Sequence, residues 1–231
     1  MTSLSVKQLS EQLQVSERTI YRMVDRGDLP GRKVGGQWRF WKSEVDYWLD
    51  LRMTRLALPD LQEMNLQVRD GVGPLGSVLT EANALIPLSP GTRREVIHAF
   101  VDAISLPDRV DRGLLADRIC EREDARPTGT AEGIAFLHTA RWQPRTLIGV
   151  DLVAVGRLSE PTNFDAIDGA ATDILLLLLA GDDRRHLAML AGAARLSRVP
   201  GFLEGIRAAQ TGREVQDLVS RTEAALFSET P

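Results

Sequence analysis

Residues 5–48, SVKQLSEQLQVSERTIYRMVDRGDLPGRKVGGQWRFWKSEVDYW, decide the fold of the first part of this chain. Ser5 and Gln8 have the spacing of a capping box, which predicts a helix beginning after Ser5. The apolar face of this helix consists of Val6, Leu9 and Leu13. Ser16 follows a short turn and has the position of a second N-cap. The apolar face of the second helix consists of Ile20, Met23 and Val24. Two short helices joined this closely predict a helix-turn-helix.

Polar side chains surround the N-terminal turns of the second helix. In this position they can reach base edges in the major groove of DNA, and arginine can form a bidentate contact with guanine. The predicted DNA-contacting residues of this helix are Ser16, Glu17, Arg18, Thr19, Tyr21 and Arg22.

A β-hairpin, which we call the wing, is predicted after the second helix. The stretch at residues 27–30 ends the helix, and Gly35-Gly36 between two strand-like runs can adopt the positive φ angles of a two-residue turn. Positive side chains on a projecting hairpin suit contacts with phosphates or with a minor groove. The basic residues of the wing are Arg32, Lys33 and Arg39. A third helix, capped by Ser43, is expected to close the small core with Val45, Trp48 and Leu49.

The order of these residues resembles the winged helix-turn-helix of the excisionase and MerR-like proteins. The motifs are S-x-x-T-I-Y-R at residues 16–22 and L-P-G-x-K-V-G-x-x-W-R-F at residues 29–40. The resemblance implies a domain at residues 1–52 whose partner is double-stranded DNA.

The distribution of charge separates residues 1–55, which we call the head, from the rest of the chain. The chain of 231 residues has a net charge of −4, but residues 1–55 contain 10 of its 28 basic and 7 of its 32 acidic side chains, a net charge of +3. This leaves 18 basic and 25 acidic side chains, a net charge of −7, in the remainder. A basic head on an acidic body suits a DNA reader attached to a sensor.

Composition also bears on the cellular compartment. The single cysteine, Cys120, excludes an intramolecular disulfide, and no signal peptide opens the sequence. The longest apolar run, residues 174–180, is much shorter than the roughly 20 residues that a membrane helix needs. We therefore expect a cytoplasmic protein without a membrane segment.

Residues 53–74 are predicted to be a linker, because Pro59 interrupts any helix and glycines gather near its end. The leucines of residues 51–66 make it less polar than a flexible tether, and we expect it to pack on a domain or on a second subunit. One head reads only a short site, so we expect a homodimer on two half-sites.

Short apolar strands alternate with helices in residues 75–231. The predicted strands are 84–88, 133–137, 146–158 and 172–180. The predicted helices are one capped by Thr92 and those at 111–123, 184–196, 202–209 and 213–226. This order predicts an α/β fold, a sandwich in which helices flank a mixed sheet.

Two histidines have positions that suit phosphoryl chemistry. His138 ends a predicted strand after a glycine-bearing loop, and we expect its imidazole to be exposed at a surface depression, although a lone histidine there is more often structural. His186 opens the helix after the apolar strand, where a second imidazole can stabilise charge on phosphoryl oxygens. His98 is expected to pack on an apolar helix face. No zinc-type spacing joins the histidines and Cys120, so we expect no metal and no cofactor.

The order of features after the linker resembles the type-2 enzyme IIA domain of the sugar phosphotransferase system, in its nitrogen-regulatory branch. The motifs are E-R-E at 121–123, T-G-T-A-E-G-I-A-F-L-H at 128–138, N-F-D-A-I-D-G at 163–169 and H-L at 186–187. By this resemblance His138 is the phosphoryl acceptor, His186 its support and Arg122 an active-site arginine. The resemblance also places Phe164, Asp168 and Gly169 in the loop before the apolar strand.

The chain departs from the family pattern T-G-I-G-x-G-I-A-I-P-H in the loop and at the residue before the histidine. Thr130 and Ala131 replace Ile-Gly, and Leu137 replaces the proline before the histidine. The replaced glycine would allow close backbone approach, and the replaced proline would stiffen the turn. Both changes bear on how the imidazole of His138 is presented.

Three interpretations of the whole chain remain open on the sequence. The first is a transcriptional regulator whose DNA binding responds to phosphorylation of His138 by a histidine phosphocarrier protein. The second is a phosphotransferase component that passes the phosphoryl group on, and the third is a sensor that binds a partner and is never phosphorylated. In each case we expect a phosphoryl acceptor or binding domain rather than a turnover enzyme.

Overall fold

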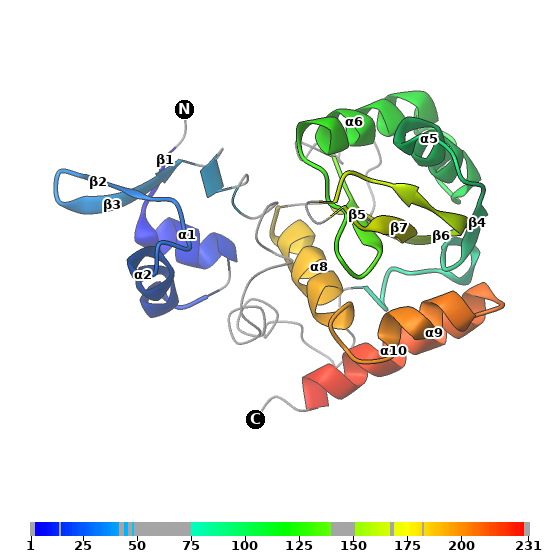
Figure 1. Ribbon diagram of the computed structural model, residues 1–231. Helices are drawn as coiled ribbons and strands as arrows, with labels where there is room; N and C mark the ends of the chain where they lie inside the picture. Colours follow the sequence, from blue (N-terminus) through cyan, green and yellow to red (C-terminus); the bar gives the residue numbers. More distant parts are fainter. Residues whose placement is uncertain are drawn as a thin grey trace. The chain divides into compact units, whose positions relative to one another are not determined.

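A computed structural model describes most of the chain (Figure 1). The described residues are 3–13, 15–41, 44, 45, 48, 75–139, 151–166, 169–181 and 183–228. The chain separates into two compact units, residues 1–69 and 70–231. No helix in these described ranges is long and apolar enough to cross a membrane. The predicted linker, residues 53–74, lies outside the described residues.

Among its described residues, the first unit has the helices α1 and α2 and a three-stranded antiparallel sheet (Figure 1). Its elements are β1 (Ser3–Leu4), α1 (Val6–Leu13), α2 (Glu17–Asp25), β2 (Arg32–Val34) and β3 (Gln37–Trp41). β3 lies between β1 and β2. The predicted apolar faces of both helices are buried, together with Phe40, Val45 and Trp48. The rest of the predicted third helix, including Ser43 and Leu49, lies outside the described residues.

Short-range interactions form this unit as the sequence predicts. The N–H of Ser5 donates to Oε1 of Gln8 at 2.9 Å, and the N–H of Gln8 donates to Oγ of Ser5 at 3.2 Å, which is the capping box. The N–H of Thr19 donates to Oγ of Ser16 at 3.1 Å, so Ser16 is the N-cap of α2. Gly35 and Gly36 have φ angles of 59° and 79°, and they close the wing between β2 and β3.

The second unit is an α/β sandwich. Its first elements are η1, a 3-10 turn (Glu81–Asn83), β4 (Ile86–Leu88), α5 (Arg93–Ala103), α6 (Arg112–Ala125) and β5 (Ile134–Leu137). The remaining elements are β6 (Leu152–Asn163), β7 (Ala171–Leu179), α8 (Asp183–Leu196), α9 (Phe202–Ala208) and α10 (Gly212–Ser228). The strands form one mixed sheet in the order β4-β6-β7-β5, in which β4 is parallel to β6, β6 is antiparallel to β7, and β7 is parallel to β5.

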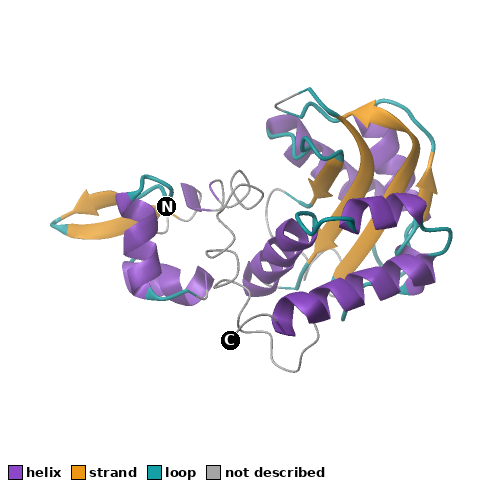
Figure 2. Ribbon diagram, turned by 60° about the horizontal axis from the view of Figure 1, so that its bottom comes forward, coloured by secondary structure: helices purple, strands orange, loops and turns teal. Residues whose placement is uncertain are grey.

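Helices cover both faces of this sheet (Figures 1 and 2). Leu175 and Leu177 of β7 pack into the core beneath α5 and α6, whereas Ile174 and Leu176 line the opposite face with side chains of α8, α9 and α10. Successive strand residues point to opposite faces, so burial on both faces explains the uninterrupted leucine run of β7. The same alternation in β5 directs Ala135 and Leu137 toward α5 and α6, and Ile134 toward the other helices.

The structure corrects several details of the sequence-based expectations. The first strand of this unit begins at Ile86, two residues later than predicted, because the 3-10 turn η1 precedes it. β6 extends to Asn163, beyond the predicted end at 158, and residues 146–150 lie outside the described residues. His98 does not pack inside an apolar face, because its side chain is 36% exposed and its Nε2 lies 3.4 Å from Oδ1 of Asp117.

Candidate functional site

The ends of two parallel strands bring the predicted phosphoryl residues together. β5 and β7 run in the same direction, so the residue after β5 and the helix after β7 lie at the same edge of the sheet. His138 follows β5 and His186 lies near the start of α8, and the centroids of their rings are 5.1 Å apart with an interplanar angle of 56°. By strand alternation His138 lies on the face that α8 covers, which explains why the two imidazoles meet.

The exposure predicted for His138 is wrong. The residue is 2% exposed, because it lies on the helix-covered face of the sheet rather than at an open strand end. Burial lowers the pKa of the His138 imidazole well below its ordinary value, and the positive charge of Arg122 and the imidazole of His186 lower it further. The ring is therefore neutral at pH 7. Its Nδ1 lies 3.2 Å from the carbonyl oxygen of Thr139, and because a carbonyl oxygen only accepts, the proton is on Nδ1 and the lone pair on Nε2.

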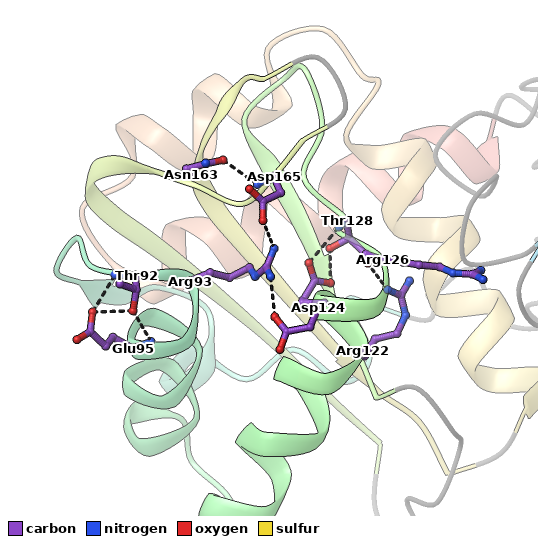
Figure 3. A network of polar contacts seen from close by, with 10 residues as sticks. Thr92, Arg93, Glu95, Arg122, Asp124, Arg126, Thr128, Asn163 and Asp165 are labelled. Carbon is purple, nitrogen blue, oxygen red and sulfur yellow. Dashed lines mark hydrogen bonds and ion pairs between the residues drawn. The ribbon is translucent and has the colours of Figure 1, made fainter.

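Arg122 is buried at the end of α6, close enough to His138 to lower its pKa. Its Nη1 donates to the carbonyl oxygen of Arg126, which follows the helix (Figure 3). This bond holds the guanidinium against the turn that leaves α6. A fixed guanidinium beside a neutral imidazole is an arrangement that suits an incoming phosphoryl group.

The turn before β5 accommodates Ala131, which replaces a glycine of the family pattern. Gly133 has a φ of 84°, and a Cβ there would lie 2.8 Å from Oδ1 of Asp173 and 2.9 Å from Nη2 of Arg207. Ala131 is exposed and its φ is not positive, so alanine causes no backbone strain. Arg207 of α9 holds the turn with Nε and Nη2 on the carboxylate of Asp173, at 2.7 and 2.9 Å, and with Nη2 on the carbonyl oxygen of Glu132 at 2.6 Å.

A second arginine holds the loop between β6 and β7. Arg93 donates to Asp124 at the end of α6 and to Asp165 in the loop, both at 2.6 Å (Figure 3). Asp165 has a φ of 50°, and its N–H donates to Oδ1 of Asn163 at 2.8 Å. Phe164 is fully buried. Gly169 has a φ of 76°, and Asp168 lies outside the described residues.

The predicted DNA-contacting residues of α2 divide into two groups. The side chains of Glu17, Arg18, Tyr21 and Arg22 are exposed. Thr19 is buried, because its hydroxyl lies 2.9 Å from the hydroxyl of Ser16 within the N-cap, so the prediction of an exposed Thr19 is wrong. Ser16 is exposed but its Oγ accepts from the helix backbone.

The basic side chains of the wing contact their own hairpin. The guanidinium of Arg32 lies 5.2 Å from the ring centroid of Trp41, and its Nη2 is 2.9 Å from a carboxylate oxygen of Glu44. Nζ of Lys33 lies 5.2 Å from the ring centroid of Trp38. Arg39 donates to the side-chain oxygen of Gln37 at 3.2 Å. The aromatic and acidic partners of Arg32 keep it close to the base of the wing.

Potential metal ligands do not gather in one place within the described residues. Over the part of the chain that the structure describes, no group of three or more His, Cys, Asp or Glu side chains is arranged to hold a metal ion. Cys120 is a buried free thiol, and burial raises its pKa.

Three residues that support the site were not predicted from the sequence. The buried Glu123 and the half-buried Thr128 form a hydrogen-bonded pair between α6 and β5, and Arg207 holds the turn before β5. The E-R-E motif includes Glu123, but no local pattern distinguishes a buried glutamate from the solvated ones that usually end a helix.

The geometry defines a two-part protein, a helix-turn-helix unit with a basic hairpin and an α/β sandwich with paired histidines at a sheet edge. Residues 3–52 match the family described as helix-turn-helix domain. Residues 77–222, more than half of the chain, match the family described as phosphoenolpyruvate-dependent sugar phosphotransferase system, EIIA 2. The chain belongs to this EIIA type 2 family, and a helix-turn-helix domain is fused to its N-terminal side.

Relatives and solved structures agree with this assignment. A protein named nitrogen regulatory protein from Pseudomonas aeruginosa is 27% identical over 149 residues, covering 63% of this chain and 94% of the relative. One of the same name from Escherichia coli is 32% identical over 122 residues, covering 52% and 71%. The crystal structure of nitrogen regulatory protein IIA-Ntr from Neisseria meningitidis superimposes with a TM-score of 0.55 at 19% identity, over 62% of this chain and 97% of the other. This last likeness shows the fold of the second unit.

Proposed function

We propose that the protein is a DNA-binding transcriptional regulator whose EIIA domain senses the phosphorylation state of the phosphotransferase system. The observation that supports the proposal best is the meeting of His138 and His186, with ring centroids 5.1 Å apart, beside the buried Arg122 in a domain fused to a helix-turn-helix. The names of the nitrogen regulatory relatives agree with a regulatory rather than a transport role.

In the proposed phosphoryl transfer, Nε2 of His138 is the attacking atom. With its proton on Nδ1 and donated to Thr139, the neutral imidazole uses the lone pair of Nε2 to attack the phosphorus of a phosphohistidine on a carrier protein. The Nε2–P bond forms as the P–N bond to the carrier breaks, and that electron pair returns to the carrier's imidazole. The guanidinium of Arg122 and the imidazole of His186 then stabilise the added charge on the phosphoryl oxygens.

The response of DNA binding is the second half of the proposal. A phosphoryl group adds close to two negative charges at one spot, and typical coupling of about 1–3 kcal/mol would change DNA affinity roughly 5- to 150-fold. We propose that the protein binds as a homodimer to two half-sites, and that Arg18 and Arg22 contact bases while the wing contacts the backbone.

The burial of His138 favours a second candidate function, a partner-binding sensor that is never phosphorylated. An imidazole that is 2% exposed must become accessible before a carrier can reach it. In this alternative the histidine pair is part of the packing, and a docked partner rather than a phosphoryl group changes DNA binding.

A phosphorylation assay separates the two candidates. The full chain is incubated with a phosphorylated histidine phosphocarrier, and phosphohistidine is detected by ³¹P NMR. We expect wild-type protein to acquire one phosphoryl group, His138→Ala to acquire none, and His186→Ala to acquire it more slowly. His98→Ala is the matched control, since His98 lies on the surface of α5. Wild-type protein that remains unmodified would support the sensor without phosphorylation.

DNA binding is tested with duplexes selected from a random library. Arg18→Ala or Arg22→Ala is expected to weaken binding to the selected site by about 1–3 kcal/mol and to relax its sequence preference. His138→Asp, which places a negative charge at the acceptor position, is expected to change affinity in the same direction as phosphorylation. Unchanged affinity in both arginine variants would refute base contacts by α2.

A further inference from the structure

Glu123 is the least exposed carboxylate in the described part of the second unit and lies directly after Arg122 in the chain. It is 0% exposed at the end of α6, where both of its oxygens accept hydrogen bonds from one residue. The N–H of Thr128 donates to Oε2 at 3.0 Å, and the hydroxyl of Thr128 donates to Oε1 at 2.7 Å. Burying a carboxylate costs free energy unless hydrogen bonds satisfy its oxygens, and here the two bonds from Thr128 do so.

Thr128 connects this carboxylate to the strand that carries the acceptor histidine. Its Oγ1 accepts the N–H of Phe136 at 3.1 Å, two residues before His138. Among the described strands β5 pairs only with β7, so its other edge needs different partners. Residues 128–130 supply them, since the N–H of Thr130 also donates to the carbonyl oxygen of Ile134 at 3.0 Å.

The chain of bonds from Glu123 through Thr128 to Phe136 therefore joins two elements of the candidate site. At one end α6 carries Arg122, and at the other β5 leads into His138. Figure 3 shows Arg122, Arg126 and Thr128 together at this end of α6. A shift of β5 relative to α6 changes the separation of the guanidinium and the imidazole, and errors of about 1 Å in such placement can cost about 100-fold in rate.

We propose that Glu123 is a positioning residue for phosphoryl acceptance: by holding Thr128 it sets β5, and with it His138, at a fixed place relative to Arg122. This inference rests on the proposed phosphoryl acceptance by His138. It assigns Glu123 no contact with the phosphoryl group. The carboxylate acts through the hydroxyl of Thr128, so the two residues form one unit.

Four variants test this assignment. Glu123→Gln and Thr128→Val break the link, whereas Thr128→Ser keeps the hydroxyl. Glu223→Gln is the matched control, because Glu223 is also buried and also accepts two hydrogen bonds, here from the N–H groups of Leu75 and Gly76, but belongs to α10. Amide spectra of each full-length variant establish that it is folded.

The first readout is the imidazole of His138 in the unphosphorylated protein. Long-range ¹H–¹⁵N spectra report its tautomer and its pKa. We expect Glu123→Gln and Thr128→Val to give a mixed tautomer and a higher pKa, because the ring leaves its buried position, while Thr128→Ser and Glu223→Gln keep the wild-type spectrum. A residue that only stabilises the fold would leave this signature unchanged.

The second readout is the rate of phosphoryl acceptance from the phosphorylated carrier. We expect Glu123→Gln and Thr128→Val to lower the maximal rate at least tenfold with little change in the half-saturating carrier concentration, and both controls to stay within twofold of wild type. If wild type accepts the phosphoryl group and Glu123→Gln accepts it equally fast with an unchanged His138 spectrum, this inference alone is refuted. If wild type accepts none, the proposed phosphoryl acceptance fails and the inference with it.

Discussion

The stability of the EIIA domain is expected to fall as the pH rises from 5 to 8 because of Glu123. Burial raises the pKa of the Glu123 carboxyl from 4.5 to about 7, and the hydrogen bonds from Thr128 and the charge of Arg122 offset part of this increase. Between the unfolded pKa of 4.5 and the folded pKa of about 7, the folded state holds a proton that the unfolded state has released. The stabilisation is therefore complete below the unfolded pKa and is lost as the pH rises through the folded pKa.

The size of the effect follows from the shift in pKa. A rise from 4.5 to about 7 corresponds to roughly 3 kcal/mol in full, of which about 2.5 kcal/mol is lost between pH 5 and 8. Other groups also titrate in this range, so the quantity to measure is the free energy of unfolding of wild type minus that of Glu123→Gln. Glutamine does not titrate, and the difference should fall by about 2.5 kcal/mol from pH 5 to 8.

Urea unfolding followed through the amide signals of β7 measures the second unit alone. Ile119→Val is the matched control, because Ile119 is buried on the same helix and the substitution removes no ionisable group. Its difference from wild type should not depend on pH. A difference for Glu123→Gln that stays constant, or that grows with pH, would show that the carboxylate is ionised in the folded protein and would refute the reasoning.

Four further predictions concern other parts of the chain. Arg39→Ala in the wing should weaken binding to all duplexes alike and lower the salt slope of log affinity by about 1, and an unchanged slope in a salt titration would argue against a phosphate contact. Thr92→Ala removes a complete capping box from α5 and should lower the free energy of unfolding by about 1 kcal/mol, as measured by urea unfolding. Gly133→Ala should cost about 1–3 kcal/mol and more than Gly169→Ala, since both have positive φ but only Gly133 has close neighbours, and equal losses in thermal unfolding would contradict the clash. Sedimentation should give a dimer on a palindromic site, and a monomer both free and bound would disprove the proposed dimer.

Interactions between near neighbours in the sequence could be predicted without the structure. The capping box of Ser5 and Gln8, the N-cap at Ser16 and the turn at Gly35-Gly36 each depend on residues at most four positions apart. Such contacts form whatever the rest of the fold does, because the backbone geometry of a helix start or a tight turn fixes them. The burial of Thr19 was not predicted, although its hydroxyl contacts the hydroxyl of Ser16 in the same N-cap.

The geometry of the candidate site depends on the pairing of two strands, β5 and β7, which no local sequence pattern predicts. Motifs selected His138, His186 and Arg122, and the alternation of strands and helices predicted the α/β class. The distance between the two rings, however, follows from β5 lying parallel to β7 and next to it, which is a contact between segments about 40 residues apart. The hydrogen bonds that Glu123 accepts from Thr128 likewise depend on how the end of α6 packs against the segment before β5.

By itself, the sequence predicted the two domains, their local caps and turns, and the residues of the candidate site. Only the tertiary structure decided that His138 is buried and neutral, that it faces α8 rather than solvent, and that Thr128 joins its strand to α6. The physical reason is that the side-chain period of a strand is two. Which of its faces is covered, and by which helix, is set by the sheet order and not by the residues of the strand.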